Sequence, residues 1–294
     1  MLGLAAGCND TSAPARPAAT HDLVFEGYPD GLPELMLRDG DTGEVRRLLP
    51  SGALAMQPAA SPDGSRIAFA VVNTDSGTGD IFVVDRDGQN LTQLTFDEAL
   101  DEQPAWSPDG ARIAFRSERT LRLGDIWVMD ADGGNPVNLT PDPPGIAIEE
   151  HHPCWSPDGA RIAFISTAGG ENDPWTMAAD GTDWVHLATS INFDSEPAWS
   201  PDGATIAFRR SSAEDPGDIV LVPAGGGGSE TVLALDGRQE APSWRPDGSG
   251  LVFAHRPTGQ QRYDIWTIDA DGAGAAPVVT AEVAGGSRKP TFLV

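Results

Sequence analysis

Residues 104–115 read Pro-Ala-Trp-Ser-Pro-Asp-Gly-Ala-Arg-Ile-Ala-Phe, and versions of this stretch recur along the chain. The aspartates of its Ser-Pro-Asp-Gly core, which is Arg-Pro-Asp-Gly in the last copy, lie 46, 49, 44 and 45 residues apart, at Asp63, Asp109, Asp158, Asp202 and Asp247. A recurrence near 45 residues, with several short strand-like runs in each copy, is typical of four-stranded sheets stacked around an axis.

One complete repeat shows how each unit is built. Residues 104–106 form a short apolar strand that runs into Ser-Pro-Asp-Gly, where Pro fixes φ, Asp bonds local backbone and Gly tolerates positive φ. Further strands are predicted at 112–116, at 125–130 and, after the Gly-rich turn 130–134, at 137–140. Each repeat therefore supplies four strands, two tight turns and one longer loop, at 117–124 in this copy.

The two ends of the chain are predicted to complete one shared sheet. Residues 23–25, 34–39 and 45–49 match the second, third and fourth strands of a repeat, but no first strand precedes them. Lys289-Pro290-Thr291-Phe292 aligns with the missing strand. We therefore predict an all-β, six-bladed propeller of four-stranded antiparallel blades, closed by the C-terminal strand, which removes an open sheet edge.

The repeat resembles that of the TolB-type six-bladed propeller, with Pro-x-Trp-Ser-Pro-Asp-Gly-x-x-Ile-Ala-Phe followed by Gly-Asp-Ile-Trp and Asp-x-Asp-Gly. The resemblance covers residues 21–294 and implies this fold. TolB itself is periplasmic and carries a small α/β domain ahead of its propeller, and similar propellers precede the catalytic domain of prolyl oligopeptidase-like enzymes. We expect neither additional domain in this chain.

The first twenty residues resemble the end of a bacterial lipoprotein signal. Small and apolar residues precede Cys8, which would be lipidated, and residues 9–20 are rich in Ala, Pro, Ser and Thr, as in a flexible tether. A signal normally has a basic segment and an apolar stretch of about 7–15 residues, so coincidence is the alternative. We expect a tether at 1–20, a propeller domain at 21–294 and a location in the bacterial cell envelope, with membrane contact only through a lipid at Cys8.

The composition restricts the class of partner. A formal net charge of −25 repels nucleic acid, so a DNA or RNA role is not expected. Part of this acidity belongs to the turns. Their Asp-x-Asp-Gly runs resemble the opening of a calcium loop, but the glutamate that completes such a loop is missing, since Phe96 stands there in the frame of Asp85.

Enzyme signatures are missing from the sequence. It has no Gly-x-Ser-x-Gly, no His-Glu-x-x-His, no phosphate-binding glycine loop and no cysteine pair spaced for zinc. No cofactor is therefore assigned from sequence motifs.

The residues just before the repeated Pro differ from blade to blade, although everything around them repeats. In propellers the loop that enters the innermost strand lies at the mouth of the central channel, together with the loop between the second and third strands; we call this side the mouth face. A site built once on a repetitive scaffold is expected to diverge in this way. The six pairs are Met56-Gln57, Glu102-Gln103, His151-His152, Ser195-Glu196, Glu240-Ala241 and Arg288-Lys289.

Two chemistries fit the mouth face. Carboxylates and imidazoles are ordinary ligands of a divalent cation in the central channel, although Arg288 and Lys289 can instead neutralise the glutamates, and a solvated polar rim is the alternative to both. The candidate metal ligands are Glu102, His151, His152, Glu196 and Glu240. Guanidinium groups in the longer loops suit an anionic ligand or an acidic partner segment, unless they pair with loop carboxylates. They belong to Arg116, Arg119, Arg209, Arg210, Arg256 and Arg262.

Three functions follow as hypotheses, because propellers host many activities. The first is a monomeric, non-catalytic module that binds an envelope protein, a peptide or a small anionic ligand at the mouth face. The second is a metal-dependent lyase or hydrolase that acts on acidic saccharides in the channel. The third is an accessory propeller of a peptidase system.

Overall fold

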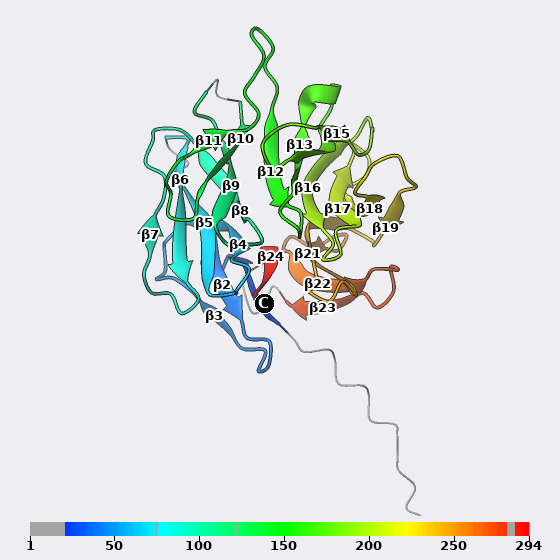
Figure 1. Cartoon of the computed structure of the whole chain (residues 1–294). Coiled ribbons are helices and arrows are strands. Elements are labelled where there is room, and N and C mark those ends of the chain that lie inside the picture. The colour runs from blue at the N-terminus through cyan, green and yellow to red at the C-terminus, as the bar shows by residue number, and fades with distance from the viewer. Residues whose placement is uncertain (1–20, 74–75, 121–122, 281–285, 294) are drawn as a thin grey trace, which may run out of the picture.

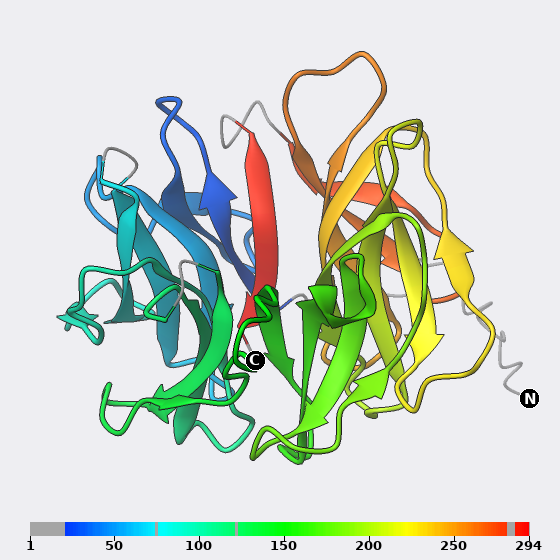
Figure 2. The ribbon, with the colours of Figure 1, turned by 90° about the horizontal axis from the view of Figure 1, so that it is seen from above.

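A computed structural model of the chain describes residues 21–73, 76–120, 123–280 and 286–293. These residues form six four-stranded antiparallel sheets that follow one another around a central axis in chain order (Figure 1). The predicted six-bladed all-β propeller is confirmed. Figure 2 shows the molecule in a view perpendicular to this axis, with the mouth face at the top.

Every blade has one strand at the axis and three outside it. From the axis outward, the closing blade comprises β24 (Ser287–Leu293), β1 (Asp22–Gly27), β2 (Glu34–Arg38) and β3 (Val45–Arg47). The next two comprise β4 (Ala55–Ala60), β5 (Arg66–Asn73), β6 (Thr78–Asp85) and β7 (Thr92–Gln93), then β8 (Asp101–Trp106), β9 (Arg112–Ser117), β10 (Asp125–Asp130) and β11 (Val137–Asn138). The last three comprise β12 (Glu150–Trp155), β13 (Arg161–Ser166), β14 (Asp173–Ala178) and β15 (Val185–His186); β16 (Phe193–Trp199), β17 (Thr205–Ser211), β18 (Asp218–Pro223) and β19 (Thr231–Leu233); and β20 (Arg238–Trp244), β21 (Gly250–Arg256), β22 (Asp264–Asp269) and β23 (Ala276–Val279). A short 3-10 helix, η1, spans Thr167–Gly169.

The repeated turn is stabilised by its own side chains. In the first copy the Ser61 hydroxyl donates to the Asp63 carboxylate at 2.6 Å and accepts from the Arg66 amide at 2.9 Å, while Gly64 has φ of 64°. The bonds to Ser61 and Ser65 lower the pKa of Asp63 to about 2. The aspartates of the turns are thus structural acceptors, and they account for part of the negative charge.

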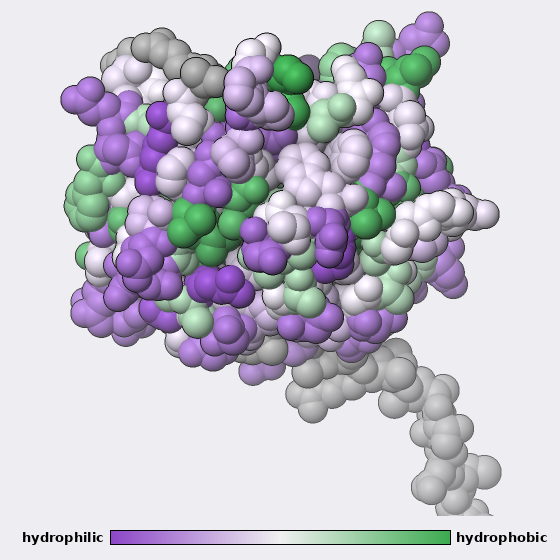
Figure 3. Space-filling view, turned by 45° about the horizontal axis from the view of Figure 1, so that its top comes forward, coloured by the Kyte–Doolittle hydropathy of each residue, from purple (hydrophilic) through white to green (hydrophobic). Residues whose placement is uncertain are grey.

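The core lies between the blades. Six phenylalanines, one from each second strand, are at most 1% exposed: Phe25, Phe69, Phe115, Phe164, Phe208 and Phe253. Tryptophans at the ends of the innermost strands join neighbouring blades, since the indole of Trp106 donates to the Ala59 carbonyl at 3.2 Å and that of Trp244 to the Ala198 carbonyl at 3.1 Å. On the side of the molecule seen in Figure 3, hydrophobic residues form small separate patches among hydrophilic ones.

The ring closes as predicted. Strand β24 pairs antiparallel with β1, with Leu23 opposite Phe292 and Val24 opposite Thr291. In Figure 2 β24 is the red strand that runs from the mouth face down the centre of the molecule. Both ends of the described chain therefore share one sheet.

Each innermost strand is bulged at the same place. The residue before the repeated Pro has a positive φ of 50–59° in all six blades: Gln57, Gln103, His152, Glu196, Ala241 and Lys289. Such values are uncommon for residues other than Gly, and the pairing register shifts at each of these positions, as in a β-bulge. The bulge changes which side chains point to the axis.

Candidate functional site

The central channel is a cavity of about 290 Å³ lined by all six innermost strands. Of each predicted pair, the second residue lines this cavity: Gln57, Gln103, His152, Glu196, Ala241 and Lys289. The first residue does not line it. The sequence-predicted candidates thus separate into two groups. The first lines the channel and comprises Gln103, His152, Glu196 and Lys289; the second does not line it and comprises Glu102, His151, Glu240 and Arg288.

The channel side chains bond neighbouring blades together. The side-chain carbonyl of Gln57 accepts from the Gln103 amide at 2.9 Å, and that of Gln103 accepts from the His152 amide at 2.6 Å. Glu196 accepts from the Ala241 amide at 2.7 Å in the same manner. A bulged backbone amide that meets an acceptor one blade away is satisfied without water, so these polar side chains hold the ring together.

A chain of donors leads from the axis to the rim. The Lys289 ammonium contacts Glu196 and lies 3.4 Å from Nε2 of His152. Since an ammonium only donates, His152 carries its proton on Nδ1, which lies 2.6 Å from Nδ1 of His151. His151 then donates from Nε2 to the Asn172 side-chain oxygen at 3.3 Å. One tautomer of each imidazole satisfies all four groups.

Burial and charge keep the groups of this hydrogen-bonded series in one protonation state. Burial, reinforced by the Lys289 charge, holds the pKa of His152 well below its ordinary value, and burial also lowers the pKa of His151. Burial opposes both charges of the Glu196–Lys289 pair, but their attraction prevails, so the pKa of Glu196 is lowered and that of Lys289 raised. The two imidazoles are neutral at pH 7.

The five candidate metal ligands are not gathered at one point. Among the residues that the structure describes, no three His, Cys, Asp or Glu side chains are placed to hold a metal ion. Glu196 is occupied by Lys289, Glu102 by Arg116 at 3.1 Å, and Glu240 by Arg238 at 2.5 Å. The sequence offered neutralisation by Arg288 and Lys289 as the alternative; in the structure Lys289 pairs with Glu196 and Arg288 lies 3.7 Å from Glu240, whereas Arg116 and Arg238, which the alternative did not include, are the nearer partners of Glu102 and Glu240.

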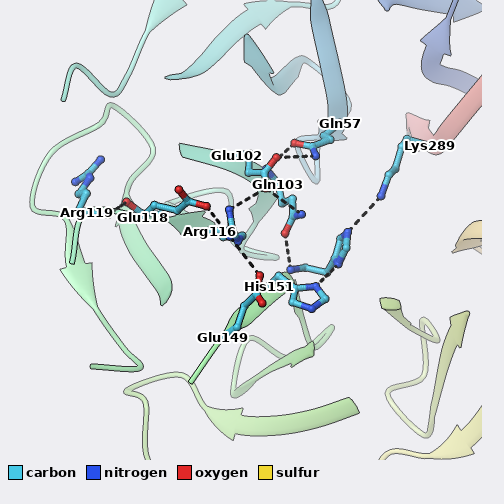
Figure 4. A network of polar contacts seen from close by, with 11 residues as sticks. Gln57, Glu102, Gln103, Arg116, Glu118, Arg119, Glu149, His151 and Lys289 are labelled. Atoms are coloured by element: carbon cyan, nitrogen blue, oxygen red, sulfur yellow. Dashed lines mark hydrogen bonds and ion pairs between the residues drawn. The ribbon is translucent and has the colours of Figure 1, made fainter. Parts of the chain in front are cut away.

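Arg116 lies at the centre of a carboxylate cluster (Figure 4). It contacts Glu102, Glu118 at 2.8 Å and Glu149 at 3.5 Å, and its side chain is only 8% exposed. Gly124 makes room for it, because a Cβ there would lie 2.1 Å from the Arg116 Nε. Arg116 is therefore a structural residue, and it lies at the end of β9 rather than in a loop.

Arg119 and Arg210 are neutralised in the same way. Arg119 contacts Asp97 and Asp101, both at 2.6 Å, and Arg210 contacts Asp194 at 2.9 Å and Glu230 at 2.6 Å. Arg209, Arg210 and Arg256 also lie in strands, so the prediction that they occupy loops is wrong for them; Arg119 and Arg262 do lie in loops.

A second group of arginines surrounds Tyr263 instead. The guanidinium carbons of Arg288 and Arg256 lie 4.4 and 5.2 Å from the centre of its ring. Arg209 donates to the Pro216 carbonyl at 3.0 Å. Sequence reasoning did not identify Tyr263 or Arg238 as candidates. The number of arginines near the pairs Glu240-Ala241 and Arg288-Lys289 could have pointed to this group.

Exposed apolar side chains also gather on the mouth face, and the sequence reasoning missed them. Of the eight large hydrophobic residues exposed in the described part of the chain, five lie in or beside mouth-face loops: Leu32, Phe96, Ile146, Ile191 and Phe193. Ile191 is 93% exposed and Phe96 76%. A signal was available for Phe96, Ile146 and Ile191, since they interrupt the loops between the fourth strand of one blade and the first of the next.

These features define a six-bladed β-propeller whose divergent face is its channel mouth. The chain belongs to the TolB beta propeller domain family, which matches residues 11–142 and 122–292. No curated protein matches its sequence.

Solved structures with the same fold have different functions in their names. TolB from Acinetobacter baumannii is 21% identical, with 94% of this chain and 68% of that chain covered and a TM-score of 0.79. An oligogalacturonate lyase from Vibrio parahaemolyticus is 13% identical (87% and 74% covered, TM-score 0.58), and a puromycin-hydrolyzing peptidase from Mycobacterium tuberculosis is 16% identical (90% and 44% covered, TM-score 0.60). At these identities the likeness shows the fold alone.

The predicted lipidation site, Cys8, and the tether at 1–20 lie outside the described residues. Within the described part of the chain, no helix has the length and hydropathy needed to span a bilayer.

Proposed function

We propose that the chain is a non-catalytic binding module of the bacterial cell envelope that holds a partner protein against its mouth face. The observation that carries this proposal is the set of exposed apolar side chains on that face. Phe96, Ile146 and Ile191 lie in the loops that lead into three successive blades. Large apolar side chains exposed together on one face of a protein are typical of a surface that binds a partner.

The channel chemistry supports binding rather than catalysis. Its carboxylate, ammonium, imidazole and amide groups are engaged with one another across blades, as at Gln103, His152, Glu196 and Lys289. A general base or nucleophile needs a free partner atom directed at substrate. The saccharide-lyase and peptidase-accessory hypotheses remain as alternative outcomes of the binding experiments.

An envelope location rests on family membership and on the Cys8 sequence. Attachment by a lipid at Cys8 would leave a propeller of this kind facing the periplasm or the cell surface. Mass spectrometry of the protein purified from membranes tests this: a diacylglycerol-modified Cys8 is expected, and an unmodified protein in the soluble fraction would contradict it.

Partner capture from envelope extracts tests the binding function. The variant Phe96→Ser/Ile191→Ser removes two exposed apolar side chains without touching the channel, and we expect it to lose a partner that the wild type retains. Leu91→Ser/Val137→Ser is the matched control, since these residues are 53% and 55% exposed but lie in a turn of the opposite face and on an outer strand. Capture that survives the first variant or is lost equally in both would refute the proposal.

Replacement of the glutamates would be a poor test. Alanine at Glu196 or Glu240 would leave Lys289 or Arg238 without its carboxylate, and alanine at Glu102 would remove one of the three carboxylates of Arg116, so each change would disturb the ring itself.

A further inference from the structure

The arginines around Tyr263 carry more positive charge than the carboxylates near them balance. The guanidinium groups of Arg256 and Arg288 lie over the Tyr263 ring, and Arg238 reaches the same site through Glu240. Glu240 is shared, with Arg238 at 2.5 Å and Arg288 at 3.7 Å. In a chain of net charge −25, this excess is local and opposite in sign to the whole.

The contrast with the neighbouring blades is internal to the molecule. Arg116 alone meets three carboxylates, and Arg119 and Arg210 meet two each. Around Tyr263, by contrast, Arg238 and Arg288 share one carboxylate, that of Glu240. The side chains of Arg238 and Arg288 are also 35% and 44% exposed, so a ligand can reach them.

A hollow of about 270 Å³ opens beside this group. Its nine lining residues come from the end of β21 and the loop after it, from the segment that enters β20, and from Pro216 in the loop between β17 and β18; they include Arg238 and Arg256 but no carboxylate. Two acidic residues adjoin the lining residues in sequence, and both accept hydrogen bonds within the protein: Asp236 from the Thr258 hydroxyl and Asp215 from the Gly217 amide, each at 2.9 Å. Gln260 and Gln261 add amide groups that can bond a peptide backbone.

A polar atom without a partner lies next to the same arginines. Tyr263 is 4% exposed, and its hydroxyl has no hydrogen-bond partner among the described residues. Buried hydroxyl groups normally bond a protein or ligand atom. A hydroxyl held among guanidinium groups is suited to donate to an anion.

We propose that this site, lined by Arg238 and Arg256 and backed by Arg288 and Tyr263, binds the side-chain carboxylates of an acidic peptide segment. The inference rests on the proposed function, since it names the partner chemistry of the mouth face. Guanidinium groups bind carboxylates in bidentate fashion, and the linear amide-bearing side chains of the hollow match a peptide backbone.

A peptide fits better than an acidic saccharide. Sugar rings bind against open aromatic faces, whereas the Tyr263 ring is buried and two guanidinium groups lie over it. None of the described residues that line the hollow is aromatic. The carboxylates are therefore the recognised groups.

Fluorescence anisotropy with the full chain tests the inference at roughly 150 mM salt, where exposed charges are screened over about 8 Å. The probes are a fluorescein-labelled hexaglutamate peptide, its hexaglutamine counterpart and an oligogalacturonate with the same number of carboxylates. We expect the hexaglutamate to bind at least about ten-fold more tightly than either of the others, which corresponds to 1.4 kcal/mol.

Two double variants with equal loss of charge locate the site. Arg238→Gln/Arg256→Gln should weaken hexaglutamate binding at least about ten-fold. Arg46→Gln/Arg86→Gln removes two arginines from the β3 and β6–β7 region, away from the hollow, and should leave binding within about two-fold. Circular dichroism confirms that each variant is folded, and the comparison between the peptides does not depend on the variants.

Each contrary result overturns the inference. Equal losses in both double variants would mean non-specific attraction, equal or tighter oligogalacturonate binding would mean a saccharide site, and no preference for glutamate would mean no carboxylate site. If any of these occurs while partner capture still depends on Phe96 and Ile191, only this inference falls. If capture does not depend on those two residues, the proposed function falls.

Discussion

The variant Glu150→Gln should stabilise the protein, and the gain should depend on pH. Glu150 begins β12, is 1% exposed, and accepts from the Ser166 hydroxyl at 2.9 Å. Burial, with a smaller contribution from the Asp125 and Asp142 carboxylates, raises its pKa to about 8. No arginine contacts it in the described structure, unlike Asp101, which occupies the equivalent position in β8 and contacts Arg119.

The magnitude follows from proton linkage. The folded protein holds the Glu150 proton up to a pKa of about 8, whereas the unfolded chain releases it near the ordinary pKa of 4.5. Between these two pKa values the free energy of unfolding falls by about 1.4 kcal/mol for each pH unit, because the folded state keeps a proton that the unfolded state releases. At pH 7 this lowers the stability of the folded protein by about 3 kcal/mol. Glutamine has no proton to lose and removes this cost. With an unfolding entropy of roughly 0.6 kcal/mol per degree for a chain of this size, Tm should rise by about 5 °C.

Thermal unfolding followed by circular dichroism at pH 5, 7 and 8 measures the effect. The gain in Tm should be small at pH 5, where the unfolded carboxyl is still partly protonated, and largest at pH 8. Asp101→Asn is the control, since it leaves Arg119 without that carboxylate and should lower Tm at all three pH values. A gain of less than about 1 °C at pH 7, or an equal gain at pH 5 and pH 8, would refute the linkage argument.

Three further predictions concern the ring. Gly124→Ala should destabilise the protein by about 2 kcal/mol, because its Cβ would displace Arg116, whereas Gly225→Ala, with open space around it, should change stability by less than about 0.5 kcal/mol in denaturant unfolding. Lys289→Met should cost about 3 kcal/mol by leaving Glu196 without its cation, and adding Glu196→Gln should restore most of it; an additive double mutant would contradict the coupling. Deletion of β24 should yield an aggregation-prone species by light scattering, because the β1 edge would be unpaired, and a monodisperse truncated protein would argue against this closure.

The fold was predictable because its determinants are local and repeated. The third strand predicted at 125–130 coincides with β10, and the Gly-rich turn 130–134 limits it on one side. The closing strand was found by aligning residues 289–292 with a repeat, and the pairing of Phe292 with Leu23 confirms it.

The site was only partly predictable, for physical reasons. The pairs such as Glu102-Gln103 were located, but a bulge decides which member faces the axis, and its left-handed residue breaks the period of two. Two of the three carboxylate partners of Arg116 come from positions 14 and 33 residues away, which repeat alignment does not relate. The loops that carry Phe96, Ile146 and Ile191 occupy equivalent places in successive blades but differ in sequence and length, so the repeat does not align their apolar residues.

The closing strand has a further consequence for how the protein folds. Lys289 is the only lysine in the sequence, and it reaches its place beside Glu196 and His152 only when β24 pairs with β1. In that pairing Leu23 lies opposite Phe292, which is 269 positions further along the chain. During synthesis, five blades can therefore assemble while a carboxylate inside the nascent ring still lacks its cation. Insertion of β24 supplies that cation and pairs the edge of β1 in one step. A strand inserted in the wrong register would form neither the ion pair nor the complete set of hydrogen bonds to β1, so closure of the ring selects the correct register.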